Sequence, residues 1–272
     1  MANEKKIKIP LGPEGRGIFK LTTGNEGQGR ASGYSTQLKE IKGVLDKFYT
    51  GEKAKTYNKS RLNDIRQVNV LDRESSIIKS FLKNSMRGNI LDVACGTGIM
   101  FKNYGNRNIY GIDISKDMLK VAKKDYPSAK LKISEAEKLP FNSNFFSAAI
   151  TSRFICHTPN YKKIIMEMTR VVKPGGSIII DFFNRNSLSL PTTKLRLIKG
   201  RLRYFNLFTY KDIIKIAQEN NLKIRYLKSK VFFPPSIFPK FMHSFANSIN
   251  LFFAELFPKL SNPMYIMFIK NK

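Results

Sequence analysis

The sequence predicts an α/β protein built on a doubly wound, mostly parallel sheet. Between residues 89 and 182, short apolar runs alternate with segments of helical period, and the first run ends in a glycine-rich turn, Ala94-Cys-Gly-Thr-Gly98. Strands and helices that alternate at this spacing form a parallel sheet with helices on both faces. Because such sheets bind ligands beyond the carboxyl ends of their strands, we expect the functional site at that edge.

The first part of the chain predicts a tail followed by a helical cap. Residues 1–37 are rich in glycine and basic residues and show no regular period, which is typical of a flexible tail. Residues 38–84 have a helical pattern instead. We expect two or three helices there, packed over the domain that spans residues 85–272. The apolar positions of the helical pattern include Leu38, Ile41, Leu45, Phe48, Ile77, Ile78, Phe81 and Leu82.

The sequence pattern from residue 85 onward predicts seven strands. Five of them lie at residues 89–93, 108–113, 130–133, 145–151 and 177–182. We expect one helix directly after the glycine turn, and others at 116–124 and 161–172, the last stopped by the turn Lys173-Pro-Gly-Gly176. After residue 184 the pattern predicts a helix at 210–220, with Thr209 as its N-cap, and strands at 222–228 and 264–269.

A Phe-rich insertion precedes the last strand. Residues 231–260 hold eight phenylalanines and three charged residues. Their apolar side chains recur at three- and four-residue steps, which predicts one broad helical face. That face is expected either to cover the mouth of the site as a lid, to dock on an anionic membrane, or to pack in the core or in a dimer interface. The apolar positions are Ile237, Phe238, Phe241, Phe245, Ile249, Leu251, Phe252, Phe253, Leu256 and Phe257.

Length and composition exclude several classes of protein. A chain of 272 residues with 42% hydrophobic residues can bury a sizeable core, which excludes disorder of the whole chain. Two cysteines, Cys95 and Cys156, are too few for a disulfide framework or a zinc cluster, so we expect no metal site. No apolar run reaches the length of about 18 residues that a membrane span needs. The N-terminal residues lack the apolar stretch of a signal peptide, so we expect a cytoplasmic protein.

The net charge is extreme. Lys and Arg number 48 and Asp and Glu 20, which gives 48 − 20 = +28. Such a charge favours polyanionic partners, namely nucleic acid, anionic lipid headgroups or phosphorylated substrates. The abundance of Lys, Asn, Ile and Phe is equally what an AT-rich genome produces, so the charge alone does not select a partner. A basic run at residues 194–203 stands next to the Phe-rich insertion and suits an anionic surface.

The glycine turn carries the clearest chemistry. Glycines let the backbone approach a ligand closely. A dinucleotide fingerprint needs a third glycine where this chain has Phe101. Asp92, just before the turn, would repel a pyrophosphate and suits a cationic ligand. Asp113, at the end of the next strand, is positioned to accept both hydroxyls of a ribose. These features describe S-adenosylmethionine better than NAD.

These segments resemble the motifs of class I S-adenosylmethionine-dependent methyltransferases, especially the small-molecule branch that contains ubiquinone and menaquinone biosynthesis enzymes. Residues 91–98 are similar to the first motif, with Ala94 where the family usually has glycine. Residues 110–115 resemble the second motif, and residues 170–176 the turn before the fifth strand. Residues 134–141 resemble the stretch along the adenine, with Glu135 in place of the usual Asp. The resemblance implies a Rossmann-like seven-stranded sheet with an antiparallel last strand.

The resemblance also implies which residues meet the cofactor and the methyl acceptor. His157, just past the fourth strand, is a candidate base, although it could instead cap the next helix or bond the backbone. Arg153 is a candidate for holding an anionic substrate group. Tyr57 and Arg61 match a weaker N-terminal pattern and are expected as cofactor-lid contacts. The other residues expected at the cofactor are Asp92, Ala94, Cys95, Gly96, Thr97, Gly98, Asp113, Ile114, Met118, Glu135, Ala136 and Thr151.

The expected function is transfer of a methyl group from S-adenosylmethionine to an O, C or N atom of a lipophilic small molecule. A quinone precursor, an isoprenoid or a lipid-linked intermediate fits the Phe-rich insertion, and the protein is then expected to bind peripherally to the inner face of a membrane. Two alternatives stay open. One is methylation of RNA or protein through the basic surface, and the other is a non-catalytic scaffold that only binds the cofactor. The pattern leaves the oligomeric state open.

Overall fold

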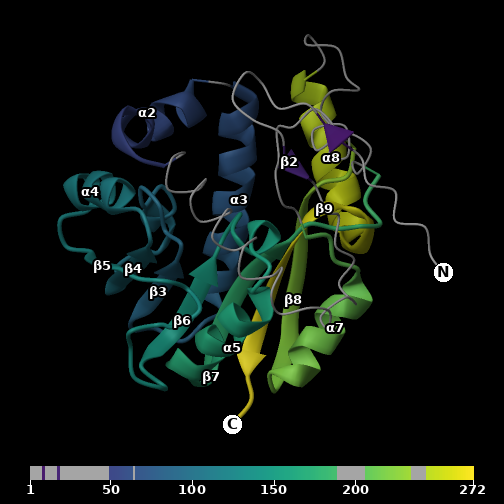
Figure 1. Cartoon of the computed structure of the whole chain (residues 1–272). Helices are drawn as coiled ribbons and strands as arrows, with labels where there is room; N and C mark the ends of the chain where they lie inside the picture. Colours follow the sequence, from purple (N-terminus) through teal and green to yellow (C-terminus); the bar gives the residue numbers. More distant parts are fainter. Residues whose placement is uncertain (1–7, 10–16, 19–48, 64, 189–205, 234–242) are drawn as a thin grey trace.

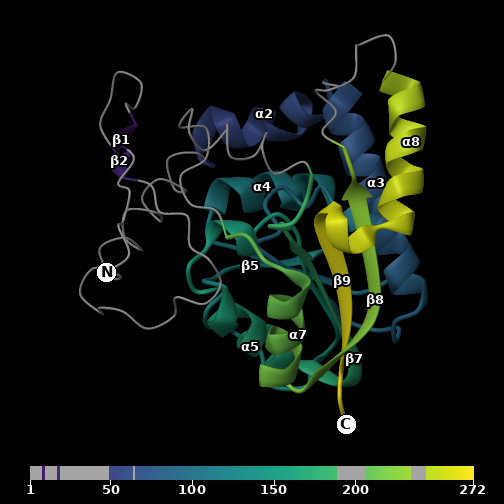
Figure 2. The same cartoon turned by 90° about the vertical axis from the view of Figure 1, so that its right-hand side faces the viewer.

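A computed structural model describes residues 8–9, 17–18, 49–63, 65–188, 206–233 and 243–272. Its main feature is a seven-stranded sheet in the order β5-β4-β3-β6-β7-β9-β8 (Figures 1 and 2). The strands are β3 (Ile90–Val93), β4 (Ile109–Asp113), β5 (Lys130–Ile133), β6 (Phe146–Thr151), β7 (Val172–Phe182), β8 (Leu222–Val231) and β9 (Asn262–Lys270). β3 to β7 are mutually parallel, and β9 runs antiparallel to both β7 and β8. The predicted sheet is confirmed.

The chain order of the strands reverses between β3 and β6. From β3 the chain moves outward through β4 to β5, then returns to place β6 on the other side of β3. Connections that leave the carboxyl ends of β3 and β6 therefore run to opposite sides, which is the position where sheets of this kind bind ligands. The glycine turn follows β3, and Thr151 ends β6. The topology thus puts both predicted motifs at one edge of the sheet.

Helices cover both faces of the sheet because side chains alternate along the central strands. Ile178 and Ile180 of β7 belong to the core on the side of α5 and α7, whereas Ile179 belongs to the core on the side of α3 and α4. Figure 2 shows α5 and α7 on one side of the sheet and α3 on the other. The helices are α2 (Gly51–Leu62), α3 (Ile65–Lys83), α4 (Lys116–Asp125), α5 (Tyr161–Val171), α7 (Tyr210–Glu219) and α8 (His243–Leu256).

One local prediction is wrong. The glycine turn opens no α-helix: a 3₁₀ turn, Phe101–Asn103, follows it, and Gly105 adopts φ +62°, which a helix does not allow. The predicted turn at residues 173–176 lies inside β7 as an irregularity of the strand. The register with β6 passes from the pair Val172–Phe146 directly to the pair Ser177–Ala148, and Gly175 has φ +76°. A Cβ atom on Gly176 would lie 2.9 Å from the Ser147 carbonyl oxygen, so this shift needs glycine.

Other predictions hold or lie outside the described residues. Thr209 caps α7 as predicted, in a reciprocal capping box with Asp212. The Phe-rich insertion contains a helix, α8, as its period predicts. Within the predicted tail, Lys8–Ile9 pairs antiparallel with Gly17–Ile18. The rest of the tail, the predicted helix positions from Leu38 to Phe48, the basic run at 194–203 and the apolar positions Ile237, Phe238 and Phe241 lie outside the described residues.

Candidate functional site

Three residues of the glycine turn adopt the left-handed backbone conformation, with positive φ. Ala94, Gly96 and Gly98 have φ values of +59°, +55° and +68°. Glycine adopts this conformation freely, whereas in Ala94 it costs about 1–2 kcal/mol of conformational free energy. A Cβ atom on Gly98 would lie 2.8 Å from the ring of Phe101, and one on Gly96 would lie 3.3 Å from the methyl group of Met118. The backbone at Gly96 is therefore half-buried and carries no side chain. A larger side chain would fill the space beside it.

Asp113 ends β4 beside this turn. Its Oδ2 accepts a hydrogen bond from the Gly96 N–H at 2.8 Å, and its Oδ1 accepts one from the Ser115 N–H at 2.8 Å. Burial raises the pKa of the carboxyl group, while these two bonds lower it. The side chain is half-exposed, and a carboxylate can accept about four hydrogen bonds, so it keeps acceptor capacity for a ligand. The carboxylate is thus fixed beside the glycine turn, at the position predicted for a ribose contact.

Helix α2 lies over the turn and over α4 (Figure 2). The Thr97 hydroxyl donates to Asn58 Oδ1 at 2.6 Å, and the Ser115 hydroxyl donates to the Tyr49 carbonyl at 2.6 Å. On α2, the guanidinium of Arg61 stands 5.1 Å from the centre of the Tyr57 ring, which in turn meets Tyr49 edge-on. The predicted lid residues Tyr57 and Arg61 therefore belong to a helix that is hydrogen-bonded to the glycine turn.

The other residues expected at the cofactor surround this edge to different depths. Ile114 and Glu135 are exposed, whereas Met118, Ala136 and Thr151 are buried. Cys95 is buried as well, and burial raises the pKa of its thiol well above the ordinary value. A Cβ atom on Gly111 would lie 2.8 Å from its sulfur. Cys95 is therefore a protonated packing residue and no nucleophile.

Asp92 is buried beneath the glycine turn. It is 5% exposed, and its Oδ2 accepts a hydrogen bond from the Tyr104 hydroxyl at 2.6 Å. Burial raises the pKa of Asp92 to about 7, while the Tyr104 bond opposes that rise. The side chain therefore packs beneath the turn, against the 3₁₀ segment that replaces the predicted helix.

Asp92→Asn should make stability less dependent on pH. The unfolded carboxyl group ionises near its ordinary value of 3.8, but the folded one keeps its proton up to about pH 7. Between these values the folded chain binds more protons, so the free energy of unfolding falls as pH rises and levels off above about 7. At pH 8 we expect Asp92→Asn to be more stable than wild type by roughly 2–4 kcal/mol. Urea titrations at pH 4.5 and 8 measure this, and equal gains at both values would contradict it.

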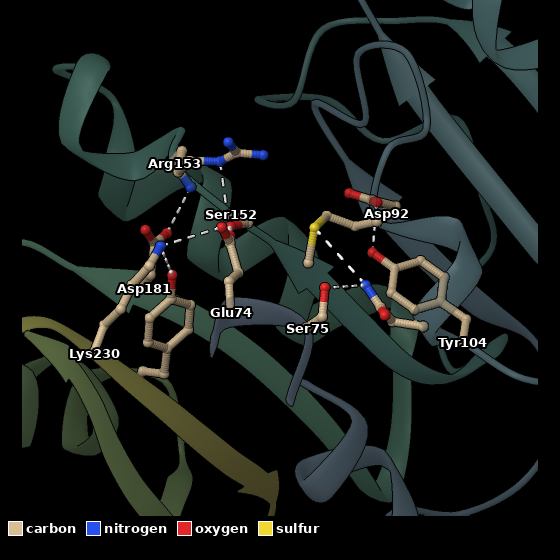
Figure 3. A network of polar contacts seen from close by, with 11 residues as sticks. Glu74, Ser75, Asp92, Tyr104, Ser152, Arg153, Asp181 and Lys230 are labelled. Atoms are coloured by element: carbon tan, nitrogen blue, oxygen red, sulfur yellow. Dashed lines mark hydrogen bonds and ion pairs between the residues drawn. The ribbon is translucent and has the colours of Figure 1, made fainter. Parts of the chain in front are cut away.

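Four charged side chains meet beyond the carboxyl ends of β6 and β7 (Figure 3). We call Glu74, Arg153, Asp181 and Lys230 the charged cluster. Glu74 of α3 is fully buried and faces Lys230 Nζ at 3.4 Å and Arg153 Nε at 3.7 Å. The Ser152 hydroxyl also donates to Glu74. Asp181 Oδ1 accepts from the backbone N–H of Arg153 at 2.7 Å, which holds that residue at φ +58°.

The cluster separates the pKa values of its two acids. Burial disfavours ionised Glu74, but Lys230, Arg153 and the Ser152 hydroxyl outweigh burial and lower the pKa of Glu74 to about 2. Burial and the neighbouring charge of Glu74 raise the pKa of Asp181 to about 7. Glu74 is thus a permanent anion, whereas Asp181 can exchange a proton near neutral pH.

The sequence predicted one member of this cluster, Arg153, and missed the other three. A usable signal was present for Asp181, which interrupts an apolar strand, Ile178-Ile-Ile-Asp181, whereas the burial of Lys230 is visible only in the structure. His157, the predicted base, is half-buried in the 3₁₀ turn Ile155–His157 after β6. The Asn206 amide donates to the carbonyls of Ile155 and Thr158 and so fixes this turn.

Known proteins with this sequence pattern and this fold point to one family. A family model described as a methyltransferase domain matches residues 91–180. An uncharacterised protein of Methanocaldococcus jannaschii is 30% identical over 149 residues, which cover 54% of this chain and 71% of that protein. The demethylmenaquinone methyltransferase of Renibacterium salmoninarum is 36% identical over 97 residues, covering 35% of this chain and 41% of that enzyme. The chain belongs to the class I S-adenosylmethionine-dependent methyltransferases.

Solved structures agree with this assignment at the level of the fold. The magnesium protoporphyrin IX methyltransferase of Synechocystis, solved with bound S-adenosylhomocysteine, has a TM-score of 0.59 at 13% identity over 85% of this chain and 100% of that one. A Thermotoga maritima methyltransferase has a TM-score of 0.56 at 16% identity over 80% and 97%. The cofactor of this methyltransferase is S-adenosylmethionine, and Gly96 and Asp113 have the geometry to hold it.

Proposed function

We propose that this methyltransferase acts on a lipophilic small molecule, such as a quinone precursor, an isoprenoid or a lipid-linked intermediate. The observation that carries this proposal is an exposed apolar surface at the edge of the sheet that holds the site. The matched quinone methyltransferases support it, although the chain spans only 41% of the Renibacterium enzyme and 40% of a related Desulfotalea psychrophila enzyme. S-adenosylmethionine, when bound, supplies an electrophilic methyl group.

The apolar surface, which we call the α8 surface, lies on the last turns of α8 and the 3₁₀ segment behind it. Its members are Phe252, Leu256, Phe257 and Leu260, which are 62%, 57%, 41% and 42% exposed. Asn250 of α8 accepts hydrogen bonds from the backbone N–H groups of Phe232 and Phe233, directly after β8 ends. Because β8 runs in the direction of β7, the surface adjoins the carboxyl edge of the sheet. Contiguous exposed apolar residues of this kind mark binding surfaces.

The residues of the chain have distinct tasks in this proposal. Asp113 holds the ribose, α2 covers the glycine turn and excludes water, and the 3₁₀ turn after β6 presents His157 to the acceptor. His157 would accept the proton of an acceptor hydroxyl group. Alignment of acceptor and donor contributes most, up to about 7–11 kcal/mol in ideal cases.

Supplying methyl-labelled cofactor to a lysate tests this function. We expect label in the lipid-extractable fraction. Label confined to RNA or protein would overturn the proposal in favour of a macromolecular acceptor, for which the net charge of +28 is the supporting feature. Label in none of the fractions would favour a scaffold that binds the cofactor without transfer.

A lipophilic acceptor resides in membranes, so we further propose that the α8 surface docks on anionic lipid. In the part of the chain that the structure describes, no helix is long and apolar enough to cross a bilayer. Lys259 stands within the surface, and each basic residue near anionic lipid adds about 1 kcal/mol. Exposed apolar side chains insert at the headgroup boundary while the charges hold the phosphates.

Phe252→Ser with Leu256→Ser should weaken binding to phosphatidylserine vesicles at least about tenfold, since two large apolar side chains are lost. Binding of the intact protein should fall as salt rises. The matched control is Ile133→Ser, which removes a 54% exposed apolar side chain from edge strand β5. Sedimentation with vesicles measures all three proteins. Intact protein that stays in the supernatant at low salt would contradict docking.

A further inference from the structure

A cavity of about 560 Å³ lies between α2 and α4, and we call it the α2–α4 cavity. Figures 1 and 2 both show α2 above α4, on the other side of the molecule from α8. The volume falls within the range of about 300–1,000 Å³ that is typical of small-molecule sites. Neither Gly96 nor Asp113 is among the residues that line it, so the cavity is separate from the cofactor site and from the α8 surface.

Lysines converge on this cavity from both helices. Lys55 and Lys59 of α2 and Lys124 of α4 line it. Lys55 pairs with Glu52 at 3.4 Å, whereas the ammonium groups of Lys59 and Lys124 have no partner within the described residues. Lys55 and Lys59 are one helical turn apart, and two cations at that spacing destabilise a helix. An anion in the cavity would relieve this repulsion.

The surrounding charge favours a ligand with two negative charges. Helices α2 and α4 together contain eight basic and three acidic residues, a net charge of +5. Within the part of the chain that the structure describes, Asp125 is the acidic residue that lines the cavity, and its Oδ2 accepts a hydrogen bond from Asn58 Nδ2 at 3.5 Å. A phosphate monoester carries a charge of about −1.5 to −2 at neutral pH. It therefore balances Lys59 and Lys124 together, whereas a carboxylate balances one of them.

Two apolar side chains in the same lining indicate an organic group on the phosphate. Leu62 of α2 is 52% exposed, and Val121 of α4 is half-buried. A ligand that covers such side chains gains free energy from the apolar surface removed from water. Inorganic phosphate leaves them exposed, whereas an aryl or alkyl phosphate covers them.

The cavity is linked to the glycine turn through Asn58. Its Nδ2 donates to Asp125 in the cavity wall, and its Oδ1 accepts the hydroxyl of Thr97 in the turn at 2.6 Å. Of the residues of α2, only Ala54 is buried, so polar contacts of this kind hold the helix in place. Exposed hydrogen bonds exchange with water and contribute little net stability. A ligand that contacts lysines of both helices would therefore stabilise α2 in its position over the turn.

We propose that the α2–α4 cavity binds an organic phosphate and that this ligand couples positively to the cofactor. The phosphate group lies between Lys59 and Lys124, and the organic group covers Leu62 and Val121. The bound ligand holds α2 over the glycine turn through the contact of Asn58 with that turn. Because coupling between two sites is reciprocal, the cofactor tightens binding of the phosphate by the same factor. This effector site goes beyond methyl transfer and does not depend on the identity of the methyl acceptor.

The test uses phenyl phosphate as the probe and inorganic phosphate, which lacks the organic group, as its comparison. Calorimetry on the full chain at pH 8 and constant ionic strength measures both. We expect phenyl phosphate to bind at least about threefold more tightly than inorganic phosphate, because its ring covers apolar surface. Saturating phenyl phosphate should tighten binding of S-adenosylhomocysteine about five- to tenfold, within the usual range of allosteric coupling. A ligand that entered the cofactor site would weaken that binding instead.

Two variants separate binding from coupling. Lys59→Gln with Lys124→Gln should weaken binding of phenyl phosphate at least about tenfold, because both charge-assisted contacts are lost. The matched control is Lys79→Gln with Lys83→Gln, which removes the same charge from exposed positions of α3 and should stay within about twofold of wild type. Thr97→Val removes the hydroxyl that holds α2. It should keep the affinity for phenyl phosphate measured without cofactor and lose most of the coupling.

Several results would overturn the inference. They are equal binding of phenyl phosphate and inorganic phosphate, an equal loss in the control variant, weaker binding of S-adenosylhomocysteine in the presence of phenyl phosphate, and full coupling in Thr97→Val. Calorimetry with S-adenosylhomocysteine alone reports whether each variant is folded and has an intact cofactor site. Protein that binds S-adenosylhomocysteine but not phenyl phosphate refutes this inference and leaves the proposed function untouched.

Discussion

Asp113→Ala is expected to weaken binding of S-adenosylhomocysteine by about 2–3 kcal/mol, some 30- to 150-fold, in isothermal calorimetry. The carboxylate accepts hydrogen bonds from the N–H groups of Gly96 and Ser115 and is predicted to accept the ribose hydroxyls as well. Alanine removes the predicted acceptor of the ribose hydroxyls. It also removes the two hydrogen bonds that hold the turn in place. The matched control is Asp72→Ala, which removes an exposed carboxylate from α3.

Gly96→Val should abolish cofactor binding altogether. Gly96 has φ +55°, which a β-branched residue adopts only with strain, and even a Cβ atom would press on Met118 at 3.3 Å. The remainder of the valine side chain would fill the space beside this backbone. Circular dichroism establishes that the variant is folded. Wild-type affinity in both Asp113→Ala and Gly96→Val would contradict the assignment of this turn as the cofactor site.

Glu74→Gln is expected to reduce the free energy of unfolding by about 3–5 kcal/mol, because it leaves the buried Lys230 and the half-buried Arg153 without their shared anion. Lys230 is 6% exposed, and its Nζ lies 3.4 Å from Glu74 Oε2 and 3.3 Å from the Tyr265 hydroxyl oxygen. Glutamine preserves the shape of the side chain and one acceptor for Ser152, so the loss measures charge. Chemical denaturation at pH 7 gives the value.

The double variant Glu74→Gln with Lys230→Met separates charge from packing. It removes one anion and one cation, so we expect it to regain a large part of the lost stability. The pH dependence provides a second check. Because the folded pKa of Glu74 is lowered to about 2, its contribution is complete above the ordinary value of 4.5 and disappears as pH falls toward 2. A Glu74→Gln variant as stable as wild type at pH 7 would show that the cluster is not held by charge.

The amino-acid sequence by itself determined the strands, their order along the chain and the position of the cofactor loop. These features are local: apolar runs end at glycine turns, and Thr209 with Asp212 closes a capping box within four residues. The resemblance around residues 91–98 and 110–115 identified the cofactor for the same reason, since each motif is contiguous. The short connection between Gly98 and β4 was misread, because the turn signal does not specify how much helix follows.

Only the tertiary structure decided how the charged cluster is built. Glu74 and Lys230 are 156 positions apart and meet because β8 and β9 are added to the edge of the parallel sheet while α3 packs across its face. A local pattern shows a charged residue but not which distant charge compensates it. The pKa values of Glu74 and Asp181 depend on that compensation, so their shifts in opposite directions follow only from the tertiary arrangement.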